Sequence, residues 1–308
     1  MSSADPSGRR PNPFTLPGRW WRGNTHTHTT RSDGQRPPAE VVEWYRQHGY
    51  DFVAITDHRR VPEADDLVIK EGGRPFCVVA GSELDLVDHE TGVPYHLVCL
   101  GLSEAVALPE EITVNEAIRL ARERAALVYV AHPYWHGHEI DDLVGVEGAV
   151  GIEIYNATCE YLNGKGTSVV HWDSLLRRGR SAWGFAADDA HWNRPDAGRA
   201  WVMVKAPALT PEAILNALAQ GHFYSSTGPT LEDVEIAGDR IRVRCSPVDR
   251  VAFIGPGTRG RVVTGADGPI TEAEVRLTGR EAYLRVEAID ADGRRAWTNP
   301  LVFTAQGV

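Results

Sequence analysis

The feature that most constrains this chain is an alternation of short apolar runs with amphipathic stretches between residues 37 and 221. Runs of this length predict buried strands, and they lie at residues 52–56, 76–84, 96–102, 126–132, 149–155 and 181–187. Helical patterns lie at residues 37–49, 114–125, 166–179 and 210–221. The last of these has Thr210 as N-cap, Pro211 at the first helical position and Gly221 as stop. Strands that alternate with helices predict parallel βα units in an α/β fold.

The two ends of the chain differ from this region. Residues 1–18 are rich in Ser, Pro, Gly and Arg, so we expect a flexible N-terminal arm. After about residue 230, alternating segments separated by turn signals such as DGP and DGR predict a small antiparallel, sandwich-like β domain. We therefore expect an arm at 1–18, an α/β domain at 19–229 and a β domain at 230–308, with a hinge at Gly228–Pro229.

Composition disfavours several classes of partner and site. The net charge of −10 makes a nucleic acid polymer or an anionic membrane surface a poor partner. The four cysteines form no CxxC pair, which argues against a disulfide scaffold and against a cysteine zinc site. No run approaches about 18 apolar residues, and the N-terminus lacks an apolar signal core. We expect a cytoplasmic protein that acts on a small molecule, and the sequence leaves the oligomeric state open.

Polar residues repeatedly follow the apolar runs, at the strand ends where catalytic groups gather in parallel βα folds. In the segment RGNTHTHTTRSDG, His26 and His28 are two residues apart, so both point to the same side of an extended strand. Asp189 and His191 repeat this spacing. Together the strand ends supply nine candidate metal ligands: His26, His28, Asp33, His58, Glu83, His96, His132, Asp189 and His191.

Imidazole and carboxylate ligands without cysteine suit zinc, manganese or iron. Nine ligands exceed the need of one ion and fit two or three divalent ions per chain. Asp57 and His58 are adjacent and point apart, so we expect His58 to enter the site and Asp57 to orient a ligand. The alternative for Asp33 is an ordinary Asp-Gly turn, and the alternative for His96 is an ordinary residue at the start of a strand.

Other side chains near the strand ends are candidates for substrate contacts, with ordinary surface charge as the alternative for the arginines. The candidates are Arg31, Arg59, Trp135 and Arg194. Trp135 and Trp192 could wall a pocket or pack in the core. Asn156 is expected to hydrogen-bond substrate or a ligand. For His136 and His138, a solvated loop is the favoured interpretation.

Five motifs occur in an order that resembles the polymerase and histidinol phosphatase (PHP) superfamily of metal hydrolases. They are HTHTTRSDG, AITDH at 54–58, Glu83 in GSEL, AHP at 131–133 and DDAH at 188–191. The segments HFYSSTGP (222–229) and DADGRRAWTNPLVF (290–303) look like the carbaryl-hydrolase-like branch of that superfamily. The resemblance implies a distorted (β/α)7 barrel, followed here by the small antiparallel β-sandwich-like domain.

The resemblance also divides the ligands among three ions. It implies that one ion is held by His26, His28, Glu83 and Asp189. Glu83 would bridge to a second ion, completed by His132 and His96. A third ion would be held by Asp33, His58 and His191. Some relatives have a histidine near the position of Asp33, so a carboxylate there puts the third ion in doubt.

The implied chemistry is hydrolysis. Metal coordination lowers the pKa of water to about 7, and Glu83 would set the separation of the ions. Asp188 or an unassigned histidine is the candidate acid for the leaving group, and no GxSxG nucleophile elbow is present. The lead hypothesis is a phosphoesterase acting on a small phosphorylated metabolite or nucleotide, by analogy with the superfamily. The alternatives are hydrolysis of a carbamate, carboxylic ester or amide, and an inactive metal-binding protein with a structural or interaction role.

Overall fold

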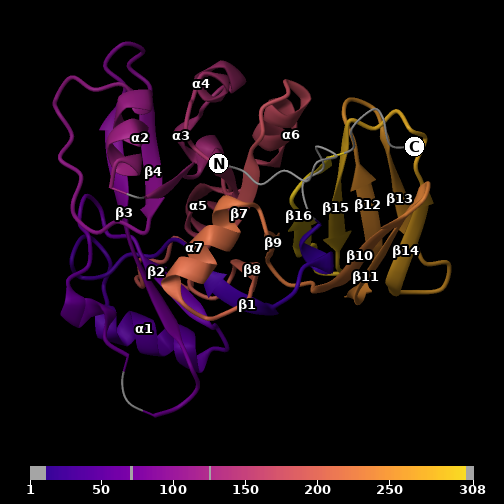
Figure 1. Cartoon of the computed structure of the whole chain (residues 1–308), viewed down its shortest axis with the longest axis horizontal. Helices are drawn as coiled ribbons and strands as arrows, with labels where there is room; N and C mark the ends of the chain where they lie inside the picture. The colour runs from indigo at the N-terminus through magenta and orange to yellow at the C-terminus, as the bar shows by residue number, and fades with distance from the viewer. Residues whose placement is uncertain (1–11, 70–71, 125, 303–308) are drawn as a thin grey trace.

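A computed structural model describes residues 12–69, 72–124 and 126–302 of the chain. The helices lie in one part of the molecule, antiparallel strands make up the other part, and the large mixed sheet runs through both (Figure 1). The main path of the large sheet runs β13-β12-β15-β16-β9-β8-β1-β2-β3-β4-β5-β6-β7, and β10-β11-β14 form a second sheet. The predicted α/β class with a second, small antiparallel sheet is confirmed.

Seven strands carry the ends at which polar residues gather. They are β1 (Arg19–Asn24), β2 (Phe52–Ile55), β3 (Cys77–Val87), β4 (Pro94–Leu100), β5 (Leu127–Val130), β6 (Gly151–Asn156) and β7 (Trp183–Ala187). The pairs β1–β2, β2–β3, β5–β6 and β6–β7 are parallel. β4 is antiparallel to both neighbours, so the prediction of parallel units is wrong there. A short turn at residues 88–93, rather than a helix, joins β3 to β4.

The two ends of this seven-strand run meet just beyond β1 and β7. Thr27 and Ala190 form an isolated parallel bridge. The His28 N–H donates to the Ala190 carbonyl at 3.0 Å, and the Asp189 N–H donates to the His26 carbonyl at 2.9 Å. Within the described residues no longer ladder joins β7 to β1. The contact therefore ties together the two segments that carry the HxH and DxH pairs.

The helices have recognisable sequence causes. They are α1 (Pro38–Gln47), α2 (Val114–Arg122), α3 (Pro133–His136), α4 (Ile140–Val144), α5 (Ala157–Asn163), α6 (Val169–Arg177) and α7 (Pro211–Ala219), with 3-10 turns η1 (Pro13–Thr15) and η2 (Ala64–Leu67). Thr210 accepts a hydrogen bond from the Ala213 N–H, as its predicted N-cap role requires. Gly221 follows the helix with φ 74°, which glycine adopts without strain.

The second half of the large sheet continues from β1 without a break. β8 (Trp201–Ala206) pairs with β1, β9 (Phe223–Ser226) pairs with β8, and β16 (Arg295–Thr298) pairs with β9, all antiparallel. The remaining strands on this side are β12 (Arg250–Ile254), β13 (Gly260–Thr264), β15 (Tyr283–Ile289) and β17 (Leu301–Val302). The sheet therefore runs across the predicted domain boundary at residue 230.

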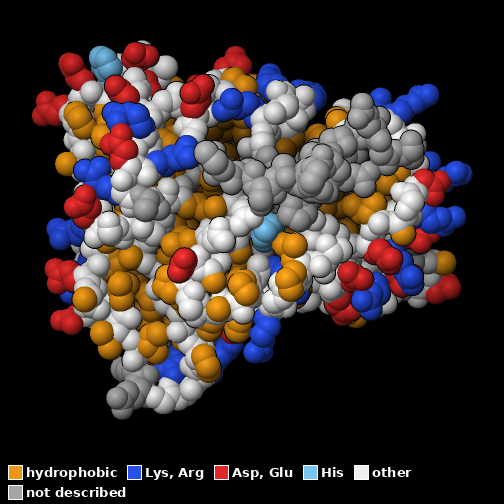
Figure 2. Space-filling model, viewed as in Figure 1, with side chains coloured by type: hydrophobic (Ala, Val, Ile, Leu, Met, Phe, Trp, Pro, Cys, Tyr) orange, Lys and Arg blue, Asp and Glu red, His pale blue; other side chains and the backbone are white. Residues whose placement is uncertain are grey.

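The three-stranded sheet covers one side of this C-terminal extension. It contains β10 (Leu231–Ala237), β11 (Arg240–Val248) and β14 (Ile270–Arg276). Val234 and Val243 of this sheet share a buried apolar cluster with Phe253 and Val286 of the large sheet. Exposed ion pairs lie on the other face, for example Arg242–Glu272 at 2.6 Å, and Figure 2 shows basic and acidic side chains side by side there. The packing is sandwich-like, as predicted.

The segment just before β1 is packed rather than free. The Asn12 side chain donates to the Val234 carbonyl at 2.5 Å. The Phe14 ring lies 4.9 Å from the ring of Trp20 and 5.9 Å from that of Tyr224. Residues 12–14 therefore contact β1, β9 and β10 and do not form part of a free arm. Residues 1–11 lie outside the described residues.

The structure also describes the state of the cysteines and the length of the apolar helices. All four cysteines, Cys77, Cys99, Cys159 and Cys245, are buried free thiols, as the absence of CxxC pairs predicted. None of the described helices is long and apolar enough to cross a membrane.

Candidate metal centre

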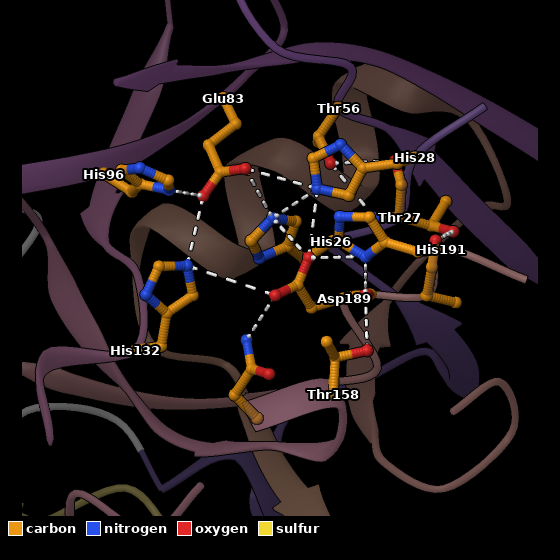
Figure 3. Close-up of polar contacts among 12 residues, drawn as sticks. His26, Thr27, His28, Thr56, Glu83, His96, His132, Thr158, Asp189 and His191 are labelled. Atoms are coloured by element: carbon orange, nitrogen blue, oxygen red, sulfur yellow. Dashed lines mark hydrogen bonds and ion pairs between the residues drawn. The ribbon is translucent and has the colours of Figure 1, made fainter. Parts of the chain in front are cut away.

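All nine predicted ligands belong to groups of side chains that could hold a metal ion. Figure 3 shows His26, His28, Glu83, His96, His132, Asp189 and His191 close together. The segments after β1, β2, β5 and β7 carry most of them, because parallel strands present their carboxyl ends at the same edge. Glu83 lies within β3, which is long enough to reach this edge. His96 lies near the start of β4 and still reaches it, because β4 runs in the opposite direction. The antiparallel turn therefore places His96 in the site.

The innermost group contains His26, His28, Glu83 and Asp189, all buried. His28 Nε2 lies 3.2 Å from His26 Nε2, 3.2 Å from Glu83 Oε2 and 3.0 Å from Asp189 Oδ1. His26 Nε2 lies 3.2 Å from the same two oxygens. Four ligands placed tetrahedrally 2.0–2.1 Å from a zinc ion stand roughly 3.3 Å apart. The spacing of these donor atoms therefore fits a metal ion.

The charge distribution also fits a cation. Asp189 Oδ1 is buried and lies 3.0 Å from His28 Nε2 and 3.2 Å from His26 Nε2, and a buried carboxylate oxygen needs a proton donor or a cation beside it. Burial acts to lower the pKa of His28, but the carboxylates of Asp189 and Glu83 outweigh it and raise that pKa to about 10. The potential at the centre is thus strongly negative and favours bound positive charge.

Glu83 connects the innermost group to a second one. Its Oε1 lies 2.8 Å from His96 Nδ1 and 3.2 Å from His132 Nε2, on the side away from His26. The two oxygens of one carboxylate thus face two sets of imidazoles. This is the arrangement that a bridging ligand between two ions requires, so the alternative of His96 as an ordinary strand residue is not supported.

A third group forms around Asp33, which is half exposed. Its carboxylate lies 3.3 Å from His191 Nε2, 3.4 Å from His28 Nδ1 and 3.8 Å from His58 Nε2. The hydrogen bond from His191 holds the pKa of Asp33 well below its usual range. Asp33 therefore faces three histidines rather than serving only its Asp-Gly turn.

Two ligand residues have unusual backbones. His132 has φ 28° and Asp189 has φ 54°, values that non-glycine residues rarely adopt. Such conformations persist where the surrounding structure over-determines them, and they gather at functional sites. Here the strained positions lie at the ends of β5 and β7, where they aim side chains into the centre.

Glu153 is a functional candidate that the sequence analysis missed. It lies in β6, is fully buried, and accepts from His26 Nδ1 at 2.7 Å and from the His132 N–H at 2.9 Å. It therefore fixes the orientation of one ligand and the backbone of another. The available signal was a single charged residue inside the apolar run GIEIY.

Asp57 and Asn156 form hydrogen bonds with the segments that carry the candidate ligands. The carboxylate of Asp57 accepts from the Thr29 N–H at 2.8 Å and from the Ser32 hydroxyl at 2.6 Å, which holds the loop between His28 and Asp33. Asn156 donates to Asp189 Oδ2 at 3.1 Å. Each of these two side chains can therefore fix the position of a candidate ligand without contacting a metal ion.

Asp188 does not occupy the position expected of a general acid. Its buried carboxylate accepts from the N–H groups of Gly198, Arg199 and Ala200 at 2.7–2.8 Å and from the Tyr45 hydroxyl at 2.8 Å. Burial raises the pKa of Asp188 to about 6 against these hydrogen bonds. The prediction of Asp188 as the acid is therefore not supported, because this side chain anchors the 198–200 loop.

A cavity of about 410 Å³ opens beside the ligands. Two of the residues predicted to contact substrate, Trp135 and Arg194, line it, and their contact with substrate stays a prediction. Arg31 and Arg59 do not line it, because Arg31 pairs with Asp66 at 2.8 Å and Arg59 pairs with Asp85 at 3.0 Å. For these two arginines the prediction of substrate contact is not supported.

The structure also bears on the expectations for Trp192, His136 and His138. Trp192 donates to the His28 carbonyl at 3.0 Å and packs against Trp44, so it supports the HxH segment and does not line the cavity. His138 is buried and His136 is partly buried, so the solvated-loop interpretation is wrong. The rings of His136 and His96 lie 4.6 Å apart.

Comparisons with known proteins bear on the fold. No protein-family model and no curated protein sequence matches the chain. Among solved structures, a two-domain protein from Bacteroides vulgatus, which contains a predicted PHP-like metal-dependent phosphoesterase, aligns over 95% of this chain and 99% of its own, with a TM-score of 0.52 and 16% identity. The fold of this chain is therefore PHP-like. The predicted resemblance holds at the level of the fold, and the likeness to the carbaryl-hydrolase-like branch stays a prediction.

Two other solved structures align less well. A proposed metal-dependent phosphoesterase from Bifidobacterium adolescentis aligns with a TM-score of 0.46 and 16% identity, over 65% of this chain and 96% of its own. A lesion-specific endonuclease from Pyrococcus furiosus aligns with a TM-score of 0.43 and 16% identity, over 65% of this chain and 56% of its own.

Proposed function

We propose that this chain is a metal-dependent hydrolase with two or three divalent ions, of zinc, manganese or iron, and a small-molecule substrate. The observation that carries the proposal is the convergence of nine imidazole and carboxylate side chains around the buried carboxylates of Glu83 and Asp189. In this proposal the seven strands act as a distorted barrel, closed by the Thr27–Ala190 bridge. The strands after residue 230 form a separate domain attached through β9 and β16.

The roles of the chain's own residues follow from their positions. Divalent ions at this site would supply Lewis-acid activation of water and of the substrate oxygen. Glu83 presents one oxygen to each of two ligand groups and so fixes their separation. Glu153 holds His26 with Nε2 directed inward, and Asn156 holds Asp189. These contacts keep the ligand atoms in place before substrate binds.

A phosphate ester is the substrate that we favour. Arg194 lines the cavity, and its Nη1 is buried with no hydrogen-bond partner in the described residues. A buried guanidinium N–H beside a metal centre suits a phosphoryl oxygen, since charge-assisted bonds to phosphate are strong. The cavity volume of about 410 Å³ suits a small phosphorylated metabolite or nucleotide.

The rival substrate is an aryl carbamate, ester or amide. Trp135 and Leu162 form an apolar wall of the same cavity, next to the buried thiol of Cys159. Such a wall suits a planar ring better than a small phosphorylated metabolite. The two proposals therefore assign the selectivity of the pocket to different side chains.

One assay separates them. We would load the protein with manganese, zinc or iron and measure turnover of p-nitrophenyl phosphate and p-nitrophenyl acetate. The phosphoesterase proposal predicts metal-dependent phosphate turnover, and a loss of about tenfold or more in kcat/KM for Arg194→Met, given about 1.5–3 kcal/mol for a hydrogen bond to a charged group. Arg119→Met, on the exposed face of α2, is the matched control. Turnover of the acetate alone would favour the rival.

The metal content tests the enzyme proposal itself. Protein purified without added metal should contain about two or three ions per chain. A content near zero, together with no effect of a chelator on thermal unfolding, would support a non-enzymatic role for the barrel.

A further inference from the structure

His136 is a partly buried histidine that the proposed ion sites do not use. It follows His132 by four residues and lies at the end of the short helix α3, for which His132 is the N-cap residue. The two imidazole rings lie 5.1 Å apart. His136 therefore lies beside a residue already placed among the metal ligands.

The third member of this group comes from another element. The ring of His136 lies 5.1 Å from that of His132 and 4.6 Å from that of His96, and the rings of His96 and His132 are 5.1 Å apart. Each of the three offers a nitrogen within 4.8 Å of the others. The three rings thus come together from β4 and from residues 132–136, and two of them, His96 and His132, also contact Glu83.

One nitrogen atom of His136 has no partner. His136 Nε2 is buried and has no hydrogen-bond partner in the described part of the chain. Buried polar atoms in native proteins are normally satisfied. A cation bound among the three rings would satisfy the lone pair of this nitrogen.

The loop that follows His136 is fixed in place. His138 Nε2 donates to the Pro94 carbonyl at 2.7 Å, and His171 Nε2 donates to the His138 carbonyl at 2.8 Å. Pro94 begins β4, the strand that carries His96. The hydrogen bond to β4 therefore holds His136 and His96 next to each other without a metal.

We propose that His136 is a metal ligand that adds a third imidazole to His96 and His132 at the ion shared through Glu83. This inference rests on the proposed metal centre. A site of three imidazoles and one carboxylate binds zinc more tightly than manganese, because borderline ions prefer nitrogen ligands. The ion at this site should therefore be zinc, even if the ion held by His26, His28, Glu83 and Asp189 exchanges for another metal.

The test compares His136→Ala and His136→Asn with wild type and with His89→Ala, an exposed histidine in the β3–β4 turn. Each protein is stripped with a chelator, and its thermal unfolding and circular dichroism are recorded to confirm folding. Zinc affinity is then measured by competition with a chromophoric chelator, and cobalt is titrated while its visible absorption is followed.

We expect both His136 variants to bind the second zinc equivalent at least about 100-fold more weakly than wild type, since even indirect support of a ligand is worth 10–100-fold. Their second cobalt equivalent should show an altered visible spectrum, and His89→Ala should match wild type. If wild type binds zinc and both variants retain its affinity and spectrum, His136 is not a ligand and the inference fails alone. If wild type binds no metal, the proposed function fails with it.

Discussion

At the residue scale, the candidate centre depends on Glu153, which belongs to none of the three groups of candidate ligands. Glu153 lies behind His26, with Oε1 2.7 Å from His26 Nδ1. Because Nδ1 must donate to this carboxylate, His26 Nε2 is left with its lone pair directed toward Glu83 and Asp189. The other oxygen of Glu153 accepts from the His132 N–H at 2.9 Å, so one carboxylate orders ligands from β1 and β5.

Replacing this carboxylate should weaken the centre without removing a ligand. We expect Glu153→Gln to lower affinity for the most tightly bound ion by about 10–100-fold, the usual cost of removing support behind a histidine ligand. Competition against a chromophoric chelator measures this affinity. Glu147→Gln, at an exposed site, is the control. Unchanged affinity in Glu153→Gln would mean that His26 is oriented by packing alone.

The sequence identifies the candidate ligands but not the side chains that orient them, and the reason is physical. His26 and Asp189 follow apolar runs directly, where a polar residue has few structural uses. Glu153 lies inside a run, and a charged residue there can face solvent or the interior. Which way the side chain faces depends on the tertiary contact just beyond β1 and β7, which encloses β6 on this side. His136 was hidden because four-residue helices leave no periodic pattern.

At the element scale, the β3–β4 hairpin is the feature that the sequence analysis misjudged. An apolar run predicts a strand but not its direction, so β4 was expected to be parallel. The direction is set by the turn at 88–93, where Asp88 Oδ1 accepts from the N–H groups of Glu90 and Thr91 at 3.1 and 3.0 Å. The Thr91-Gly92 pair was the available signal of a tight turn.

Asp88 provides a stability prediction for this hairpin. Its Oδ2 accepts from the Val114 N–H at the start of α2 at 2.8 Å, so it joins the turn to a helix. Asp88→Asn should lower the free energy of unfolding at neutral pH by about 1–3 kcal/mol, because it replaces a buried acceptor with a donor. Urea unfolding of metal-free protein measures this difference. Asp267→Asn, in an exposed turn, should change it by less than about 0.5 kcal/mol.

The difference in the free energy of unfolding between wild type and Asp88→Asn should depend on pH. Burial acts to raise the pKa of Asp88, but the N–H groups of Val114 and Thr91 outweigh it and hold that pKa below its usual value. A lowered pKa in the folded state stabilises the protein above the unfolded pKa of about 3.9. This stabilisation is lost as pH falls through the folded value. The gap between wild type and Asp88→Asn should therefore narrow below about pH 4, and a gap that widens there would contradict the assignment.

At the scale of the whole molecule, ion binding and folding should be linked. A ligand that binds only the folded chain at 100 times its dissociation constant adds about 2.7 kcal/mol to stability. A chelator should therefore lower the thermal midpoint of protein as purified, and a return of zinc should restore it. The combined replacement of His26 and His28 by Ala should remove the response to chelator. A chelator effect that persists in this variant would place the stabilising ion elsewhere.

A buried ion pair joins the two parts of the molecule. Arg285 of β15 is 1% exposed and forms a two-pronged pair with Asp173 of α6, at 2.7 and 2.8 Å, while its Nη1 lies 2.9 Å from Glu287. The continuous sheet through β9 and β16 connects the same two parts by backbone bonds. Side-chain and backbone links thus act in parallel across the boundary that composition predicted at residue 230.

Breaking this pair from the α6 side should be costly. Asp173→Ala leaves the buried Arg285 with one carboxylate fewer, and removal of one partner from a buried pair costs about 3–5 kcal/mol. Because Asp173 is partly exposed, we expect the lower end of that range. Replacing the pair together, with Asp173→Leu and Arg285→Met, should recover part of the loss, since the buried guanidinium is removed and the buried Glu287 keeps its ion pair with Arg295. Urea unfolding measures both variants, and metal content should stay at the wild-type value because neither residue is near the ligands. Equal losses in the single and double variants would show that packing of α6, rather than the ion pair, holds the two parts together.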